Sequence, residues 1–280
     1  MQTVLTIAGF DPSSGAGVTA DLMVFAAHGL FGTACITGLT VQSTLGVQAI
    51  HPTDATVVGA TLECLRHDLP PKGIKIGMLS STENILSISS YMDKLRISVE
   101  YPREVLVVLD PVLWSSSGRE LVDPAGIALL REQLLPLVDW ITPNLDELGL
   151  LSGANPLTRD DIPNACRTLQ ASVGKGVRGG RLGILATGGH IDPPDDFLLT
   201  PDGEEVWLPG ERVHTRATHG TGCALSSAFL SRLVLGDSPL EAAKAAKDYV
   251  TGAMRSASCL GAGRGPMRHL WQLANVKDGE

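Results

Sequence analysis

Residues 218–223 read Thr218-His219-Gly220-Thr221-Gly222-Cys223, and the apolar residues that follow, up to Leu230, recur at helical spacing. A glycine-rich turn that opens a helix leaves several backbone N–H groups unpaired, and the helix dipole adds partial positive charge there. The same position lowers the pKa of a thiol in the first turn, and Cys223 occupies it. The stretch therefore predicts a cradle for developing negative charge beside a proton acceptor, which suits phosphoryl or acyl transfer. The alternative is a structural glycine loop with a buried cysteine.

The composition around this stretch is that of an ordinary globular protein, with 280 residues, 44% of them hydrophobic and 19% charged. The formal net charge of −8 argues against a general nucleic-acid binder, because contact with a run of phosphates needs basic residues. The five cysteines form no CxxC pair and have no metal-ligand spacing with histidine, which is typical of reduced thiols. No signal-type segment opens the chain, and no apolar run reaches membrane-spanning length. We therefore expect a soluble cytoplasmic protein.

Short apolar runs alternate with segments of helical periodicity along the chain. We expect strands at residues 3–8, 33–41, 74–79, 105–109 and 140–142, and a hairpin that joins 197–201 to 205–208. We expect helices at residues 18–29, 52–69, 85–95, 124–137, 224–235 and 239–258, and one that opens at Asn144. The alternation predicts an α/β fold: one domain over residues 1–280, with a doubly wound, mostly parallel central sheet flanked by helices on both faces.

Polar motifs follow the expected strands at their carboxyl ends, which is where doubly wound sheets bind ligands. They are Gly9 to Gly17, Gln42-Ser43, Gly77-Met78, Asp110-Pro111, Thr142 to Asn144 and Thr187 to His190. The Gly9 to Gly17 turn departs from GxGxxG spacing, and no acidic residue ends the second strand, so a dinucleotide site is not indicated. The chain has no GxxxxGK[ST] motif either. A ligand crevice is thus predicted without either nucleotide signature.

Several polar residues in these motifs have a structural and a functional interpretation. Asn144 and Glu147 form a capping box, or they orient a hydrated Mg²⁺ ion. Asp110 is a turn former, or a second acidic group near that metal. Asp21 is a solvated helix residue, or a hydrogen-bond acceptor that faces the crevice. For His190, a structural hydrogen bond is favoured over catalysis.

Together these motifs resemble the ribokinase-like superfamily, and specifically the hydroxymethylpyrimidine/phosphomethylpyrimidine kinases of thiamine biosynthesis. The resemblance runs almost from end to end. It rests on the motifs Ala8 to Gly17, Ala20-Asp21-Leu22, Lys75 to Met78, Leu109 to Val112, Ile141 to Leu145, Gly188 to His190 and Thr218 to Cys223. The last motif is the most specific, because ribokinase-like sugar kinases usually end it with Asp, whereas the pyrimidine kinases and some pyridoxal kinases end it with Cys.

The resemblance implies phosphorylation of 4-amino-5-hydroxymethyl-2-methylpyrimidine, and then of its monophosphate, with ATP and Mg²⁺. It implies that Cys223 is the base and that the N–H groups of Gly220, Thr221 and Gly222 bind the γ-phosphoryl group. The other implied site residues are Asp21 and Gln42 at the aminopyrimidine edge, Met78 and Val112 against the ring, Thr187, Gly189 and Thr218 at the nucleotide, and Asp110, Asn144 and Glu147 at the metal and its waters. A homodimer is common in the family, and no nucleic-acid or membrane partner is implied.

The chain departs from the family pattern at three positions. Thr187 stands where a lysine usually precedes Gly-Gly-His, Leu113 where a lysine often follows Asp-Pro-Val, and Phe10 where a small polar residue is common. Two missing cations cost about a few kcal/mol at a polyphosphate site. A slow enzyme, a shifted substrate or a substitute cation are the three outcomes that we consider. Rival functions are pyridoxal kinase and a non-catalytic pyrimidine-binding regulator.

Overall fold

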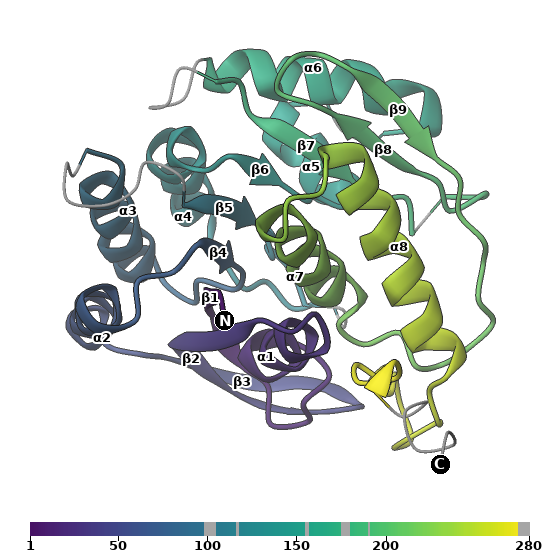
Figure 1. Cartoon of the computed structure of the whole chain (residues 1–280), viewed down its shortest axis with the longest axis horizontal. Helices are drawn as coiled ribbons and strands as arrows, with labels where there is room; N and C mark the ends of the chain where they lie inside the picture. The colour runs from purple at the N-terminus through teal and green to yellow at the C-terminus, as the bar shows by residue number, and fades with distance from the viewer. Residues whose placement is uncertain (98–104, 116–117, 155–156, 175–179, 190, 274–280) are drawn as a thin grey trace.

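A computed structural model describes residues 1–97, 105–115, 118–154, 157–174, 180–189 and 191–273. Within these residues, nine strands form one sheet in the order β3-β2-β1-β4-β5-β6-β7-β8-β9 (Figure 1). They are β1 (Thr3–Phe10), β2 (Phe31–Ser43), β3 (Gly46–Pro52), β4 (Gly73–Ile76), β5 (Leu106–Leu109), β6 (Trp140–Ile141), β7 (Gly183–Ala186), β8 (Asp196–Leu199) and β9 (Glu205–Leu208). The strands from β2 to β7 pair in parallel, whereas β3, β8 and β9 are antiparallel to their neighbours. The predicted mostly parallel sheet is confirmed.

Helices cover both faces of the sheet, as the doubly wound pattern predicts (Figure 1). One layer holds α1 (Gly17–Ala27), α7 (Thr221–Val234) and α8 (Pro239–Arg255). The other holds α2 (Ala55–Asp68), α3 (Thr82–Ile97), α4 (Pro124–Leu129), α5 (Leu145–Ser152) and α6 (Ile162–Val173). Neighbouring strand residues divide between the two cores, so that Val107 packs under the second layer and Val108 under the first. Strands that are buried on both faces explain the continuous apolar runs.

Several elements differ from the expectation, which named neither helix α6 nor strand β7. Strand β3 was not expected, and it pairs with β2 through a two-residue turn in which Ser43 faces Gly46, a glycine at φ +126°. The helix expected at 124–137 ends as α4 at Leu129 and continues as a π-helical turn, Leu130–Leu134, and a 3-10 turn, Leu135–Leu137. Pro136 explains this break, because it has no N–H to donate and its ring crowds the preceding turn.

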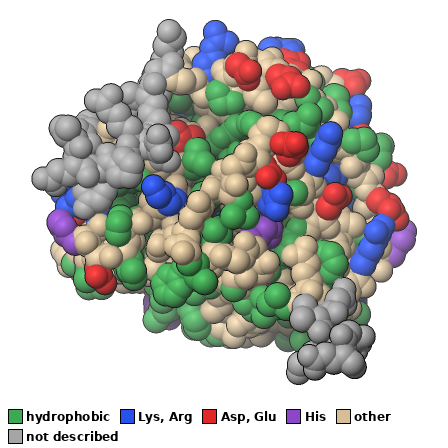
Figure 2. All heavy atoms as spheres, viewed as in Figure 1, with side chains coloured by type: hydrophobic (Ala, Val, Ile, Leu, Met, Phe, Trp, Pro, Cys, Tyr) green, Lys and Arg blue, Asp and Glu red, His purple; other side chains and the backbone are tan. Residues whose placement is uncertain are grey.

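The strand order changes direction at β1, because β2 is added on one side of it and β4 on the other. The carboxyl ends of strands at such a switch point are the usual ligand site of an open α/β sheet. The N-terminus of α7 lies at this edge, because a Cβ on Gly222 would be 4.0 Å from Asp110 Oδ2, just beyond β5. On the face shown in Figure 2, acidic and basic side chains are interspersed over the surface. Among the described residues, no helix is long and apolar enough to cross a membrane.

Candidate functional site

The turn at the start of α7 is held by close backbone packing. Gly220 adopts φ +82° as the N-cap residue, and a Cβ there would lie 1.8 Å from the carbonyl oxygen of Gly15. A Cβ on Gly15 would in turn lie 2.1 Å from the ring of His219. Glycine is therefore required at both positions, because any larger residue would separate the two loops. The structure thus brings the loop after β1 against the predicted anion cradle.

Cys223, in the first turn of α7, faces a buried carboxylate. The Asp110 carboxylate and the backbone of Gly17 both act on the pKa of its thiol. Burial raises the pKa of the Cys223 thiol to about 12, and the negative charges of Asp110 and Asp21 act in the same direction against Lys75. The expected lowering of this pKa is therefore wrong. The reason is that desolvation and neighbouring carboxylates outweigh the helix terminus.

Lys75 is the cation at the centre of this cluster, and it is fully buried. Its ammonium lies 3.0 Å from Asp21 Oδ2 and 3.9 Å from Asp110 Oδ2. A Cβ on Gly77 would lie 2.7 Å from Nζ, so the glycine leaves room for the charged group. Burial alone would lower the pKa of Lys75, but the negative charges of Asp21 and Asp110 raise it, so the ammonium stays charged.

Asp21 is enclosed by protein donors and does not face the crevice. Its side chain is fully buried and accepts hydrogen bonds from Thr6 Oγ1 at 2.6 Å and Ser227 Oγ at 2.8 Å, in addition to Lys75. The prediction that Asp21 contacts the substrate ring is corrected on this ground, and so is its interpretation as a solvated helix residue. A carboxylate with these partners serves to hold Lys75 in place.

Asn144 and Glu147 form the capping box that the sequence indicated as one alternative. Asn144 Oδ1 accepts from the Glu147 N–H at 3.0 Å, and Glu147 Oε2 accepts from the Asn144 N–H at 2.9 Å. The second oxygen, Oε1, accepts from the Leu113 N–H at 3.4 Å. Burial, with the charge of Asp110, raises the pKa of Glu147 to about 8. Both carboxylate oxygens of Glu147 are therefore already engaged, which limits direct coordination of a metal.

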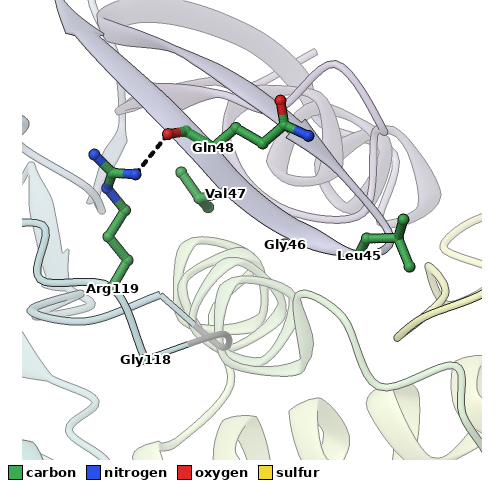
Figure 3. Close-up of a pocket in the computed structure, with 6 residues that line it drawn as sticks. All are labelled: Leu45, Gly46, Val47, Gln48, Gly118 and Arg119. Atoms are coloured by element: carbon green, nitrogen blue, oxygen red, sulfur yellow. Dashed lines mark hydrogen bonds between the residues drawn. The ribbon is translucent and has the colours of Figure 1, made fainter.

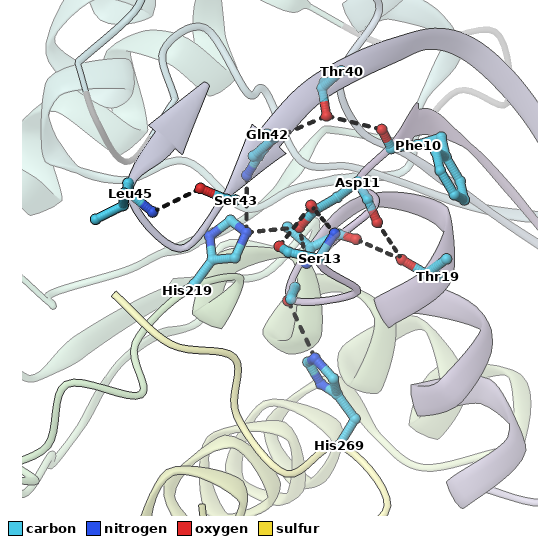
Figure 4. A network of polar contacts seen from close by, with 12 residues as sticks. Phe10, Asp11, Ser13, Thr19, Thr40, Gln42, Ser43, Leu45, His219 and His269 are labelled. Atoms are coloured by element: carbon cyan, nitrogen blue, oxygen red, sulfur yellow. Dashed lines mark hydrogen bonds and ion pairs between the residues drawn. The ribbon is translucent and has the colours of Figure 1, made fainter. Parts of the chain in front are cut away.

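A second polar network surrounds His219, which precedes the turn (Figure 4). His219 Nε2 is 2.7 Å from Asp11 Oδ2 and 3.0 Å from the carboxamide of Gln42, whose other end is 3.1 Å from Thr40 Oγ1. Burial alone would raise the pKa of Asp11, but hydrogen bonds from His219 and Ser13 bring it below its ordinary value. These contacts fix the Asp11 loop, the end of β2 and the α7 turn to one another.

Gln42 and His219 line a cavity of about 380 Å³, together with the β2–β3 turn, Gly263 and Arg264. An adjoining cavity of about 370 Å³ lies between the same turn and Gly118-Arg119, where the Arg119 guanidinium donates to the Gln48 carbonyl (Figure 3). Of the residues expected around the ring, only Gln42 lines either cavity. Met78 and Val112 are half-buried, and the Met78 side chain packs over Gly9, where a Cβ would collide with it.

The predicted nucleotide loop lies beside the capping box, because Thr187 forms a parallel bridge with Asn144. The Gly188 N–H donates to Asp196 Oδ1 at 2.8 Å, and Lys247 Nζ lies 2.6 Å from Asp196 Oδ2. Thr187 and Thr218 are half-buried and Gly189 is exposed. His190 lies outside the described residues.

Sequence reasoning missed two members of this site as functional residues, Lys75 and the Asp11–His219 pair. Lys75 had a signal, since it is the one charged residue in the apolar run Ile74-Lys75-Ile76. A cation in a strand that is buried on both faces needs an acidic partner. Asp11 and His219 are 208 positions apart in the sequence and carried no comparable signal.

Comparison with known proteins gives a consistent result. The family model described as phosphomethylpyrimidine kinase matches residues 11–268. The chain is 36% identical to a hydroxymethylpyrimidine/phosphomethylpyrimidine kinase of Haemophilus influenzae over 99% of each chain. It is also 36% identical to a bifunctional thiamine biosynthesis protein of Geobacter sulfurreducens, over 99% of this chain but only 54% of that longer protein.

Two solved structures show the same fold. A phosphomethylpyrimidine kinase from Clostridium difficile superposes with a TM-score of 0.75 at 34% identity, covering 90% of this chain and 98% of that chain. A pyridoxal kinase from Bacillus subtilis, solved as an ADP complex, superposes with a TM-score of 0.82 at 30% identity, covering 98% and 100%. These neighbours confirm the predicted ribokinase-like fold.

Proposed function

The chain belongs to the phosphomethylpyrimidine kinase family, and we propose that it transfers the γ-phosphoryl group of ATP to 4-amino-5-hydroxymethyl-2-methylpyrimidine and then to the resulting monophosphate. The observation that carries this proposal is the α7 turn, whose free N–H groups open beside Asp110 and Cys223. Gly220, Thr221 and Gly222 would stabilise charge on the transferred group, because preorganised N–H donors cost no reorganisation during the reaction.

The proton of the substrate hydroxyl leaves through Cys223 and Asp110 in this proposal. A thiol with a pKa of about 12 is a poor acceptor by itself at neutral pH. Because Cys223 and Asp110 act on each other's pKa, we place the hydroxyl proton on Sγ as the thiol proton moves to the carboxylate. The O–H bond breaks, an S–H bond is replaced, and Asp110 ends protonated. Cys223 thus acts as a base in concert with Asp110.

The donor set fits a Mg²⁺ ion held mainly through water. Burial raises the pKa values of Asp110 and Glu147 because it disfavours their charged forms, and a bound cation would stabilise those charged forms. Asp110, Asn144 and Glu147 would act on the waters of the ion, since Glu147 has both oxygens engaged and Asp110 must stay free to take the proton from Cys223. The bound ion would neutralise the phosphate oxygens.

ATP as the phosphoryl donor is supported by the ADP complex of the pyridoxal kinase neighbour. Thr187, Gly189 and Thr218 would line the nucleotide. The lysine expected at position 187 is absent, and we propose that Lys75 offsets part of the charge from below the turn. Leu113 is buried and offers only its backbone N–H, which Glu147 accepts.

The pyridoxal kinase neighbour, at a TM-score of 0.82, favours one second candidate, phosphorylation of pyridoxal. The test is ADP release from Mg-ATP with hydroxymethylpyrimidine, its monophosphate and pyridoxal, each offered separately. Turnover of both pyrimidines is the expected result. Turnover of the alcohol alone would confine the chain to the first step, and a preference for pyridoxal would replace the proposal. Tight pyrimidine binding without ADP release would make it a binding protein on a kinase fold.

A further inference from the structure

The protons of the Asp11–His219–Gln42–Thr40 network determine how Gln42 presents its carboxamide. The planar amide fills the same space in either of two orientations, so its partners decide which end is oxygen. Figure 4 draws the nitrogen toward His219. The hydrogen-bond donors and acceptors at both ends of the amide favour the reverse orientation.

At the first end, Asp11 requires a proton on His219. Asp11 is an acceptor throughout, because it receives the Ser13 N–H and Oγ–H, the Ala16 N–H and the ring nitrogen of His219. An Nε2 atom 2.7 Å from a carboxylate oxygen must carry a hydrogen, in the neutral ring or in the charged one. Nε2 has one hydrogen, directed at Asp11, and no lone pair to accept from an amide N–H, so the Gln42 atom 3.0 Å away must be the oxygen, which can share that hydrogen.

At the second end, Thr40 has one hydroxyl proton and two neighbours. Its Oγ1 lies 3.0 Å from the Phe10 carbonyl oxygen and 3.1 Å from the carboxamide of Gln42. The carbonyl oxygen can only accept, so the hydroxyl donates to Phe10 and has lone pairs left for Gln42. The Gln42 atom that faces Thr40 must then be the nitrogen. The two ends agree, although they share no partner.

We infer that His219, held by Asp11, acts with Thr40 to fix the orientation of Gln42. The carboxamide oxygen points toward His219 and the nitrogen toward Thr40. His219 is then a positioning residue, through which the site selects an amino over an oxo pyrimidine ring. This inference rests on the proposed function. After its protein contacts, the carboxamide retains one N–H and one lone pair, and Gln42 and His219 line the 380 Å³ cavity. A ring nitrogen next to an amino group matches that pair, as an adenine edge matches an amide.

An oxo ring reverses the pattern, because its carbonyl accepts and its ring N–H donates. To bind it in the same way, Gln42 must turn over, which would place its nitrogen against a protonated His219 and its oxygen against the Thr40 lone pairs. The turned orientation loses the hydrogen bond to Thr40 and sets the amide N–H groups of Gln42 against the Nε2 hydrogen of His219. Discrimination therefore comes from groups that need not touch the ring.

The test compares kcat/KM for 4-amino- and 4-oxo-5-hydroxymethyl-2-methylpyrimidine in the wild type, His219→Phe and His219→Gln. We expect the wild type to prefer the amino ring by about 10- to 100-fold. His219→Phe keeps a ring against Gly15 but has no N–H, so this ratio should fall by about tenfold, whereas His219→Gln restores a donor and most of the ratio. An unchanged ratio in His219→Phe, or an equal fall in both variants, contradicts the inference. A merely structural role would slow both rings alike.

A second measurement decides the inference even if a variant fails to fold or the wild type turns over neither ring. Nitrogen-15 NMR of the wild-type protein reads the proton on each nitrogen of His219. A proton on Nε2 is the expected result, and a ring protonated only at Nδ1 overturns the inference. Failure of the wild type to phosphorylate either ring would contradict the proposed function instead, so the two failures are distinguished.

Discussion

Two polar clusters adjoin the N-terminal turn of α7, and their carboxylates differ in what stabilises them. On the sheet side, Asp110 and Glu147 are buried, and burial raises the pKa of each. On the loop side, Asp11 receives hydrogen bonds from His219 and Ser13 that bring its pKa below the ordinary value. The sheet side is therefore poised to receive a cation or a proton, whereas the loop side is complete and serves to orient its neighbours.

Substitution of Lys75 has the largest expected effect, and it tests the cluster on the sheet side. Lys75→Met leaves Asp21 buried without its cation, and we expect the free energy of unfolding to fall by about 3–5 kcal/mol. Urea denaturation followed by circular dichroism measures the change. Lys72→Met is the matched control, because Lys72 is exposed three residues earlier, and its effect should stay within about 0.5 kcal/mol. Equal effects in the two variants would show that Lys75 is not the cluster's structural cation.

Gln42 tests the loop side. Gln42→Leu removes the polar pair offered to the ring, and the KM for the pyrimidine should rise about 10- to 100-fold because the ring's polar edge is left unpaired. The KM for ATP should not change. Gln48→Leu, an exposed glutamine on the neighbouring strand β3, is the control and should leave both KM values near the wild type. An unchanged pyrimidine KM in Gln42→Leu would remove this residue from the pocket.

The two clusters should also differ in the sign of their pH dependence, which is the smallest effect. Glu147 keeps a proton in the folded protein between its ordinary pKa of 4.5 and about 8, where the unfolded chain has lost it. Metal-free protein should therefore lose stability as the pH rises through that window, by at most about 1.4 kcal/mol per pH unit for this group. The lowered pKa of Asp11 acts in the opposite sense. Asp11 stabilises the folded protein above pH 3.8, and this contribution is lost as the pH falls below that value.

Urea denaturation at about pH 5 and about pH 8 measures the slope. Glu147→Gln should flatten it, whatever its effect on the absolute stability, and Glu132→Gln, at an exposed position, should not. A slope that is the same in Glu147→Gln and the wild type would contradict the raised pKa.

The contrast between the clusters also separates what the sequence predicts from what it does not. The glycines of the α7 turn, the alternation of strands and helices and the Asn144–Glu147 capping box are local patterns, and the structure confirms each of them. Strand β3 carries Gln48 and His51 and has no strong pattern of its own, because its pairing with β2 makes it a strand. A hairpin edge of this kind depends on its partner more than on its own residues.

The errors in the predicted site have the same origin. The side chains that β4, β5 and α7 bring together decide whether Asp21 faces a ligand. They also decide whether the pKa of Cys223 falls or rises. Lys75 lies in β4 and Asp110 follows the adjacent strand β5, so the two reach the same point only when the sheet is assembled. The α7 turn was predictable from its residues, and its electrostatic surroundings were not.

The measurement that tests the account most directly is steady-state ADP release by Cys223→Ala with hydroxymethylpyrimidine, beside calorimetric binding of the same ring. If the hydroxyl proton leaves through Cys223 to Asp110, kcat should fall by about 100-fold or more, while the dissociation constant of the pyrimidine stays close to that of the wild type. A near-normal rate in Cys223→Ala would contradict the proposed proton path, and with it the assignment of the α7 turn as the place where the phosphoryl group is transferred.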